Sequence, residues 1–382
     1  MDAARWWTAL AAALLLGACH SDRQSLTVAL AILPSELPTY RAVLDEFERV
    51  SGQRTVVVPQ QYSEIRRALA AEAAAGRGAL DLVELDVYSL AAAAEDVAVL
   101  DPGELGDVLE ALTPSALQPG SIHGLRFVPH RLSWQALIYN RAVLGEPPRT
   151  WDELLAVARA HPGKIGFKGA LYEGLTCDIL SFVWAAGGRG DVFDDAGALK
   201  AFRLFAQLAP YLHPESATFK EPTIAEAMAR GELVLHFNWP FAMSLYASQG
   251  LAPDPIRAAP LPQGPAGRAT PLGGGYLGIP RNAPDRAATL ALVRHLLGAA
   301  AQGRFARELG WFSPRRDVPV PSGALLGGFA AMQDVVRPRP ERPDYARLSR
   351  LWQEAFRSVV FEHGDPAATL EAAAQSFAGA GH

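Results

Sequence analysis

The chain has 382 residues, of which 49% are hydrophobic and 20% are charged. These are the proportions of a globular protein, and the length favours two domains over one. The formal net charge of -5 lacks the basic excess that binding to phosphates requires, so no nucleic-acid partner is predicted.

The N-terminus has the layout of a secretory signal. Arg5 precedes an apolar run over residues 6–16, which is too short to span a bilayer as a helix. The run leads into Leu16-Gly17-Ala18-Cys19, which resembles a bacterial lipobox. We therefore predict a signal peptide over 1–18, lipid attachment at Cys19 and a lipidated linker over 19–25. The alternative is a plain signal peptide in which the cysteine falls by chance.

From residue 26, segments typical of strands and of helices alternate along the chain. Short apolar or β-branched runs predict the strands, and apolar residues at helical spacing predict the helices. The predicted strands are 26–33, 55–58 and 81–85, and the predicted helices between them are 39–50 and 63–75. This alternation is typical of an α/β fold with an open, parallel sheet and helices on both faces.

The second half continues the same pattern. Two capping boxes, Thr150 to Glu153 and Thr223 to Glu226, predict helix starts, because each side chain can satisfy a free backbone N–H. Asp365 followed by Pro366 predicts the start of the last helix. The remaining predictions are strands at 233–237 and 276–279, a loop over 252–271, and helices at 286–309 and 345–361.

Signatures of catalysis are missing from the sequence. Residues 273–278 match Gly-x-Gly-x-x-Gly, but they lead into a strand, whereas a phosphate-binding loop opens a helix. The histidines show no metal-ligand spacing, and no P-loop or Gly-x-Ser-x-Gly is present. We therefore predict no enzyme activity, no metal and no cofactor. Cys177 lies among apolar residues and is interpreted as a small buried side chain.

Two predicted strands end in residues suited to binding a sugar. Asp86 follows one strand, and Asn238 and Trp239 follow another. Ligands of open sheets bind outside the carboxyl ends of the strands. Sugar hydroxyls donate hydrogen bonds to carboxylates and both donate to and accept from amides, and the apolar faces of sugars stack on indoles. The alternatives are that Asp86 caps a helix and that Trp239 belongs to the core.

Several short motifs resemble, in order and spacing, those of one family. They are Pro147–Leu154, Tyr172–Cys177, Asn238–Phe241, Gly310–Arg316 and the Arg339-Pro340 pair before Pro343 and Tyr345. The chain is similar to bacterial extracellular solute-binding proteins of ABC transporters, in their carbohydrate (trehalose/maltose-binding) branch. The resemblance covers nearly the whole mature chain.

The resemblance implies a two-lobed periplasmic-binding-protein-like fold with discontinuous lobes and a ligand cleft at the hinge. The expected N-terminal lobe comprises 26–133 plus 277–330, and the expected C-terminal lobe comprises 134–276 plus 331–382. It implies a monomer that binds a mono- or disaccharide and delivers it to ABC permease subunits in the inner membrane. The protein would be extracytoplasmic, in the periplasm or at the cell surface.

The resemblance also implies ligand contacts at Glu36, Asp86, Trp239 and Arg339. Further candidates from the same motifs and their surroundings are Asn238, Tyr276, Tyr172 and Glu173. Three positions depart from the family pocket, namely Ser133, Gly275 and Phe241, which favours a different or smaller ligand. The rival functions are ligand sensing without transport, binding of a non-sugar polar solute, and an extracytoplasmic enzyme of similar architecture.

Overall fold

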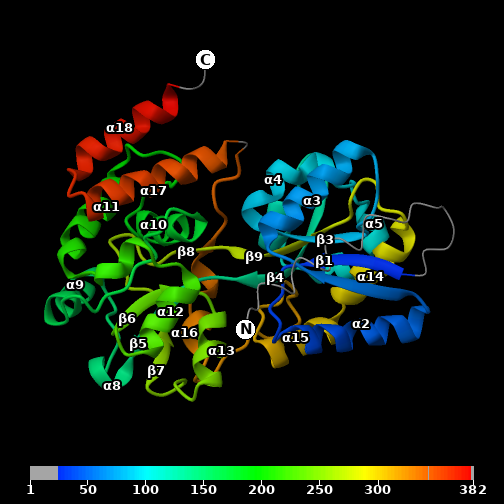
Figure 1. Ribbon diagram of the computed structural model, residues 1–382, viewed down its shortest axis with the longest axis horizontal. Coiled ribbons are helices and arrows are strands. Elements are labelled where there is room, and N and C mark those ends of the chain that lie inside the picture. Colours follow the sequence, from blue (N-terminus) through cyan, green and yellow to red (C-terminus); the bar gives the residue numbers. More distant parts are fainter. Residues whose placement is uncertain (1–24, 343, 380–382) are drawn as a thin grey trace, which may run out of the picture.

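The computed structural model describes residues 25–342 and 344–379, which form two α/β lobes lying side by side (Figure 1). The predicted signal peptide and Cys19 lie outside the described residues. Three segments run between the lobes: strand β4 (Phe127–Ser133), strand β9 (Gly273–Gly278) and the segment before helix α17 (Tyr345–Phe361). Within the described ranges, no helix combines the length and apolar character needed to cross a membrane.

The first lobe is built on a five-stranded sheet with the order β2-β1-β3-β9-β4. Strand β1 pairs in parallel with β2 and β3, whereas β9 pairs antiparallel with β3 and β4. A strand from far along the sequence therefore completes the lobe. The strands are β1 (Ser25–Leu30), β2 (Arg54–Pro59), β3 (Leu82–Asp86), β4 (Phe127–Ser133) and β9 (Gly273–Gly278).

Helices cover both faces of this sheet because alternate strand residues point to opposite sides. Val28 and Leu82 pack with α2, α14 and α15, whereas Ala29 and Val83 pack with α3 and α4. The helices of this lobe are α2 (Leu37–Ser51), α3 (Tyr62–Ala75), α4 (Leu90–Ala93), α5 (Pro102–Leu105), α6 (Asp107–Glu110), α7 (Pro114–Leu117), α14 (Arg286–Leu296) and α15 (Ala299–Leu309).

The second lobe surrounds a three-stranded sheet, β6-β5-β7, and a two-stranded pair, β10-β8. Its strands are β5 (Ala136–Asn140), β6 (Leu235–Asn238), β7 (Ile256–Ala259), β8 (Thr270–Pro271) and β10 (Val336–Arg337). Its helices are α8 (Arg141–Leu144), α9 (Trp151–Ala160), α10 (Glu173–Ala185), α11 (Ala196–Leu208), α12 (Glu221–Ala229), α13 (Phe241–Ser248), α16 (Gly327–Ala330), α17 (Tyr345–Phe361) and α18 (Pro366–Ala378). Helix α10 is buried on all sides after Glu173, in keeping with its mostly apolar sequence.

Most predicted elements are present, with three corrections. The helix predicted over 286–309 is interrupted at Leu297-Gly298, and the loop predicted over 252–271 contains β7 and β8. The cap at Thr150 is confirmed, since its hydroxyl accepts a hydrogen bond from the Glu153 N–H. The cap predicted at Thr223 is wrong, because α12 begins at Glu221 and the Thr223 hydroxyl accepts from the Lys220 N–H inside the first turn.

The expected lobe boundaries need two corrections. Residues 273–276, expected in the second lobe, form strand β9 of the first sheet. Phe312 and Phe329, expected in the first lobe, belong to the core of the second. The reason is Trp134, whose ring stacks on Phe312 with centroids 4.2 Å apart and whose indole N–H donates to the Phe329 carbonyl at 2.7 Å.

Candidate functional site

The ends of three strands of the first sheet bring polar side chains to one edge. Asp86, at the end of β3, lies opposite Gly275 of β9, and Gly275 lies opposite Arg131 of β4. Strand β1 ends at the same edge, and the loop that follows it carries Glu36. This is the edge at which ligands of open α/β sheets bind.

Arg339 joins this edge to the second lobe. The residue lies just after strand β10 and is only 6% exposed. Nη2 donates to Asp86 Oδ1 at 2.8 Å, and Nη1 donates to Glu173 Oε1 at 2.8 Å. A buried guanidinium requires such partners, since an unpaired charge is costly away from water. One carboxylate comes from each lobe, so these charge-assisted hydrogen bonds hold the two lobes together.

Glu173 is fixed by the second lobe. As the first residue of α10, it accepts hydrogen bonds from Ser349 Oγ at 2.8 Å and from the Tyr345 hydroxyl, both on α17. Cys177 lies one turn further along α10 and is buried, as the sequence predicted, with its Sγ 3.6 Å from Arg339 Nη1. Burial raises the pKa of the Cys177 thiol, so it stays protonated.

Asp86 has two roles in the structure. Its Oδ1 accepts a hydrogen bond from the Tyr88 N–H at 3.2 Å, so it caps the short helical turn Val87–Ser89. The same carboxylate pairs with Arg339, whose guanidinium carbon lies 5.2 Å from the Tyr88 ring centroid. Burial, with the Asp86 charge added, raises the pKa of Tyr88 to about 12. Asp86 therefore caps the helical turn and pairs with Arg339 at the same time.

The loop after β6 presents Trp239 to the first lobe. Asn238 is fully buried, and its Oδ1 accepts from the Trp239 N–H at 2.9 Å while its Nδ2 donates to the Glu221 carbonyl at 3.1 Å. Asn238 thus fixes the loop. Trp239 is half-buried, and its indole lies so close to Gly273 that a Cβ there would be 2.7 Å from ring atom Cζ3.

Glu36 is held by an indole and a backbone amide. Trp311 Nε1 donates to Glu36 Oε1 at 2.8 Å, and the Leu33 N–H donates to Oε2 at 2.7 Å. The Arg131 guanidinium carbon lies 4.4 Å from the Trp311 ring centroid. Trp311 and Arg131 were not among the predicted site residues, although Trp311 stands in the Gly310–Arg316 motif.

Beneath Arg131 lies a fully buried carboxylate, Glu84. Arg131 Nε donates to Glu84 Oε1 at 2.9 Å, and His130 Nδ1 lies 3.0 Å from the same oxygen. Burial alone would raise the pKa of Glu84, but the charge of Arg131 and the hydrogen bond from His130 lower it to about 2. Glu84 therefore stays ionised and fixes the arginine.

The structure does not bring Tyr276 into this site. Tyr276 is fully buried in the core of the first lobe, and its hydroxyl donates to the Ala116 carbonyl at 2.8 Å. Its place in β9 points it to the face covered by α3 and α4. Tyr172 directly precedes Glu173. Its ring centroid lies 5.6 Å from the Lys220 ammonium. Its hydroxyl and the Glu221 carboxylate both lie next to Gly174.

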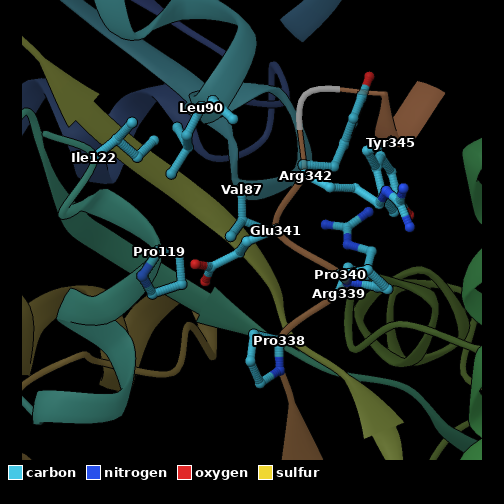
Figure 2. Close-up of a pocket in the computed structure, with 12 residues that line it drawn as sticks. Val87, Leu90, Pro119, Ile122, Pro338, Arg339, Pro340, Glu341, Arg342 and Tyr345 are labelled. Atoms are coloured by element: carbon cyan, nitrogen blue, oxygen red, sulfur yellow. The ribbon is translucent and has the colours of Figure 1, made fainter. Parts of the chain in front are cut away.

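A pocket lies between the first lobe and the segment that carries Arg339 (Figure 2). Its wall on the first lobe is apolar, and the Glu341 carboxylate points from the opposite side toward that wall. With a volume of ≈ 40 Å³, it holds water molecules but not a sugar ring. It is lined by Val87, Tyr88, Leu90, Ala91, Pro119, Ile122, Pro338, Arg339, Pro340, Glu341, Arg342 and Tyr345.

A larger, open pocket of ≈ 590 Å³ lies beside Pro338, Pro340 and Glu341 and is bounded by Trp184 and Arg189 of the second lobe. The segment before α17 therefore separates two hollows. Over residues 25–342 and 344–379, no group of three or more His, Cys, Asp or Glu side chains is arranged to hold a metal ion.

Two α/β lobes with carboxylates, arginines and an indole between them define a solute-binding protein. The chain belongs to the bacterial extracellular solute-binding protein family, whose family model matches residues 42–323. The protein is therefore extracytoplasmic, and it is a binding protein rather than an enzyme.

Relatives and solved structures agree with this assignment. The chain is 26% identical over 299 residues to a probable ABC transporter-binding protein of Deinococcus radiodurans, covering 69% of this chain and 71% of that protein. It is 23% identical over 241 residues to a maltotriose-binding protein of Pyrococcus abyssi, covering 60% of this chain but only 51% of that protein.

Among solved structures, maltose-bound MalE3 of T. maritima superposes with a TM-score of 0.79 at 25% identity, covering 93% of this chain and 99% of that chain. An ABC transporter solute-binding protein of Thermotoga lettingae bound with alpha-D-tagatose gives a TM-score of 0.81 at 22% identity, covering 92% and 98%. At that identity the second likeness shows the fold alone. The two-lobed fold predicted from the sequence is confirmed.

Proposed function

We propose that this protein captures a small neutral sugar between its lobes and delivers it to an ABC importer. The observation that carries the proposal is the half-buried Trp239 indole, which faces the sheet edge of the other lobe across Gly273. An indole offers the apolar surface on which a sugar ring stacks. The ligands of two similar proteins, maltose for MalE3 and maltotriose for the Pyrococcus protein, support the same class of solute.

Polar groups on the same edge supply the hydrogen bonds that a sugar needs. Asp86 and Glu36 present carboxylate oxygens that accept hydroxyl protons, and Arg339 donates. Arg339 Nε has no acceptor among the residues that the structure describes, which leaves a donor for a ring or hydroxyl oxygen. Because these groups come from both lobes, a sugar would enter while the lobes are apart and be held once they close.

A thermal-shift screen tests this function. Maltose, trehalose, maltotriose, glucose and tagatose are each added to the purified protein, with glycerol at matched concentration as the control for non-specific stabilisation. A sugar at about one hundred times its Kd stabilises the folded state by roughly 2.7 kcal/mol, which raises Tm. If Tm responds to none of the sugars, or equally to glycerol, the assignment of a sugar ligand fails.

We further propose that the mature protein is anchored to a membrane through lipid on Cys19. The support is the apolar run ending in Leu16-Gly17-Ala18-Cys19. Cys19→Ala should release the protein into the soluble fraction of cells. Mass spectrometry of the wild-type protein should show an acylated N-terminal cysteine, and an unmodified, soluble wild type would contradict the anchor.

A further inference from the structure

Three consecutive glycines cross from the second lobe into the first at residues 273–275, and each has a different neighbour. Gly273 faces the Trp239 ring, and Gly274 has a φ of +143° and lies against the Arg131 carbonyl. At Gly275 a Cβ would lie 1.8 Å from Glu84 Oε1. No side chain can therefore stand at position 275 while the Glu84 carboxylate occupies its present place.

Glu84 is fully buried and makes several hydrogen bonds. Besides Arg131 and His130, it accepts a hydrogen bond from the Ala31 N–H at 3.0 Å. Arg131 in turn donates to the Tyr62 hydroxyl at 3.1 Å and to the Ala31 carbonyl. These contacts fix the plane of the guanidinium, because a guanidinium bonded on several edges cannot rotate.

The fixed guanidinium lies under Trp311, whose indole N–H holds Glu36. The Arg131 side chain is 15% exposed and Glu36 is equally exposed, whereas Glu84 is not exposed at all. Arg131 Nη1 lies 3.8 Å from Glu36 Oε2, close enough for attraction but too far for a hydrogen bond. The contacts thus run from the buried Glu84 through Arg131 and Trp311 to Glu36.

We propose that Glu84 and Gly275 are positioning residues of the sugar site, acting through Arg131 and Trp311 to orient the Glu36 carboxylate. The inference rests on the proposed function in one respect, that Glu36 contacts the ligand. Glu84 itself touches no ligand, since its side chain is fully buried. Gly275 acts by leaving room for the Glu84 carboxylate.

The test compares Glu84→Gln with Glu104→Gln, a matched control in the same lobe whose carboxylate pairs with Arg286 away from the site. Two readouts are measured on the full chain: the Kd for maltose by isothermal titration, and the indole ¹⁵N–¹H resonance of Trp311, assigned with Trp311→Phe. Glu84→Gln should shift the Trp311 resonance without any ligand and weaken binding roughly ten- to hundredfold. Glu104→Gln should change neither.

A second variant, Arg131→Lys, keeps a positive charge beside Glu84 but removes the planar group under Trp311. It should also shift the Trp311 resonance, which keeps the test decisive if Glu84→Gln fails to fold. An unchanged Trp311 resonance and Kd in the folded variants, with only Tm lowered, would overturn the positioning role. If wild type binds no sugar while the resonance still shifts, the proposed function fails and the positioning of Glu36 stands.

Discussion

The Arg339 guanidinium and the Asp86 carboxylate meet across the two lobes at 2.8 Å, with Arg339 donating and Asp86 accepting. Arg339 extends from a strand of the second lobe, and Asp86 ends a strand of the first. The same guanidinium donates to Glu173, so one side chain links carboxylates of both lobes. The arrangement of the lobes thus depends on a residue that we also assign to the ligand site.

Arg339→Ala should open the lobes. The loss of its charge-assisted hydrogen bond to Asp86 weakens the interlobe contact by about 1.5–3 kcal/mol. Small-angle scattering without ligand should therefore show a larger radius of gyration than for wild type. The control is Arg342→Ala, because Arg342 lies in the same segment but bonds to Asp344 and to the Asp191 carbonyl. Equal radii for wild type and Arg339→Ala would contradict the role of Arg339.

Gly273→Ala should displace the Trp239 indole. The added Cβ would lie 2.7 Å from ring atom Cζ3, closer than carbon atoms approach, so the ring must move. We expect sugar affinity to fall roughly tenfold, about 1.4 kcal/mol, with little change in Tm. Gly327→Ala is the matched control, because a Cβ at Gly327 meets nothing within 4 Å. An unchanged Kd in Gly273→Ala would argue against an indole-stacked sugar.

The charges between the lobes should exclude sugar acids. Each arginine already faces carboxylates: Arg339 pairs with Asp86 and Glu173, and Arg131 pairs with Glu84. An anionic ligand would therefore meet unbalanced negative charge in a poorly hydrated site. Glucuronate should bind at least about tenfold more weakly than glucose in competition titrations. Comparable affinity for the two would show that an arginine is free to pair with the ligand.

The pH dependence of stability tests the Glu84–Arg131 pair. The folded-state pKa of Glu84 is about 2, whereas an unfolded glutamate titrates near roughly 4.3. The stability that ionised Glu84 contributes is therefore present above about pH 4.3 and is lost as the pH falls toward 2. On acidification below about pH 4.3, Tm should fall more steeply for wild type than for Glu84→Gln. Parallel curves would mean that Glu84 is not held ionised.

The sequence predicted the strand ends that carry two of the candidate site residues. Asp86 ends strand β3 and Trp239 follows strand β6, so both predicted strand ends are present. The carboxyl ends of the parallel strands β1 and β3 share one edge of the first sheet, which places Asp86 there. The apolar stretches also predicted α17 over residues 345–361 with its bounds as observed. Local patterns of this kind suffice where neighbouring residues decide the conformation.

Contacts between distant segments could not be predicted in this way. Glu84 lies in an apolar strand and is stabilised by Arg131, 47 residues away, and its space depends on Gly275. Tyr276 was predicted in the site, but it lies next to Gly275 in strand β9, and neighbouring residues of a strand point to opposite faces. Its side chain therefore enters the core of the first lobe. The register of a strand, and the sheet face on which each of its side chains lies, can be assigned only when the partner strands are known.

The sugar site itself is tested most directly by isothermal titration of Trp239→Ala. The titrant is the sugar that raises Tm most in the thermal-shift screen, and Trp151→Ala is the control, since Trp151 is also half-buried but packs on Phe182 of the second lobe. We predict that Trp239→Ala weakens binding by about 2–3 kcal/mol, roughly a hundredfold, and melts close to the wild-type Tm. Trp151→Ala should keep the wild-type Kd. Wild-type affinity in Trp239→Ala, together with a much lower Tm, would contradict the account, because Trp239 would then stabilise the fold and not the ligand.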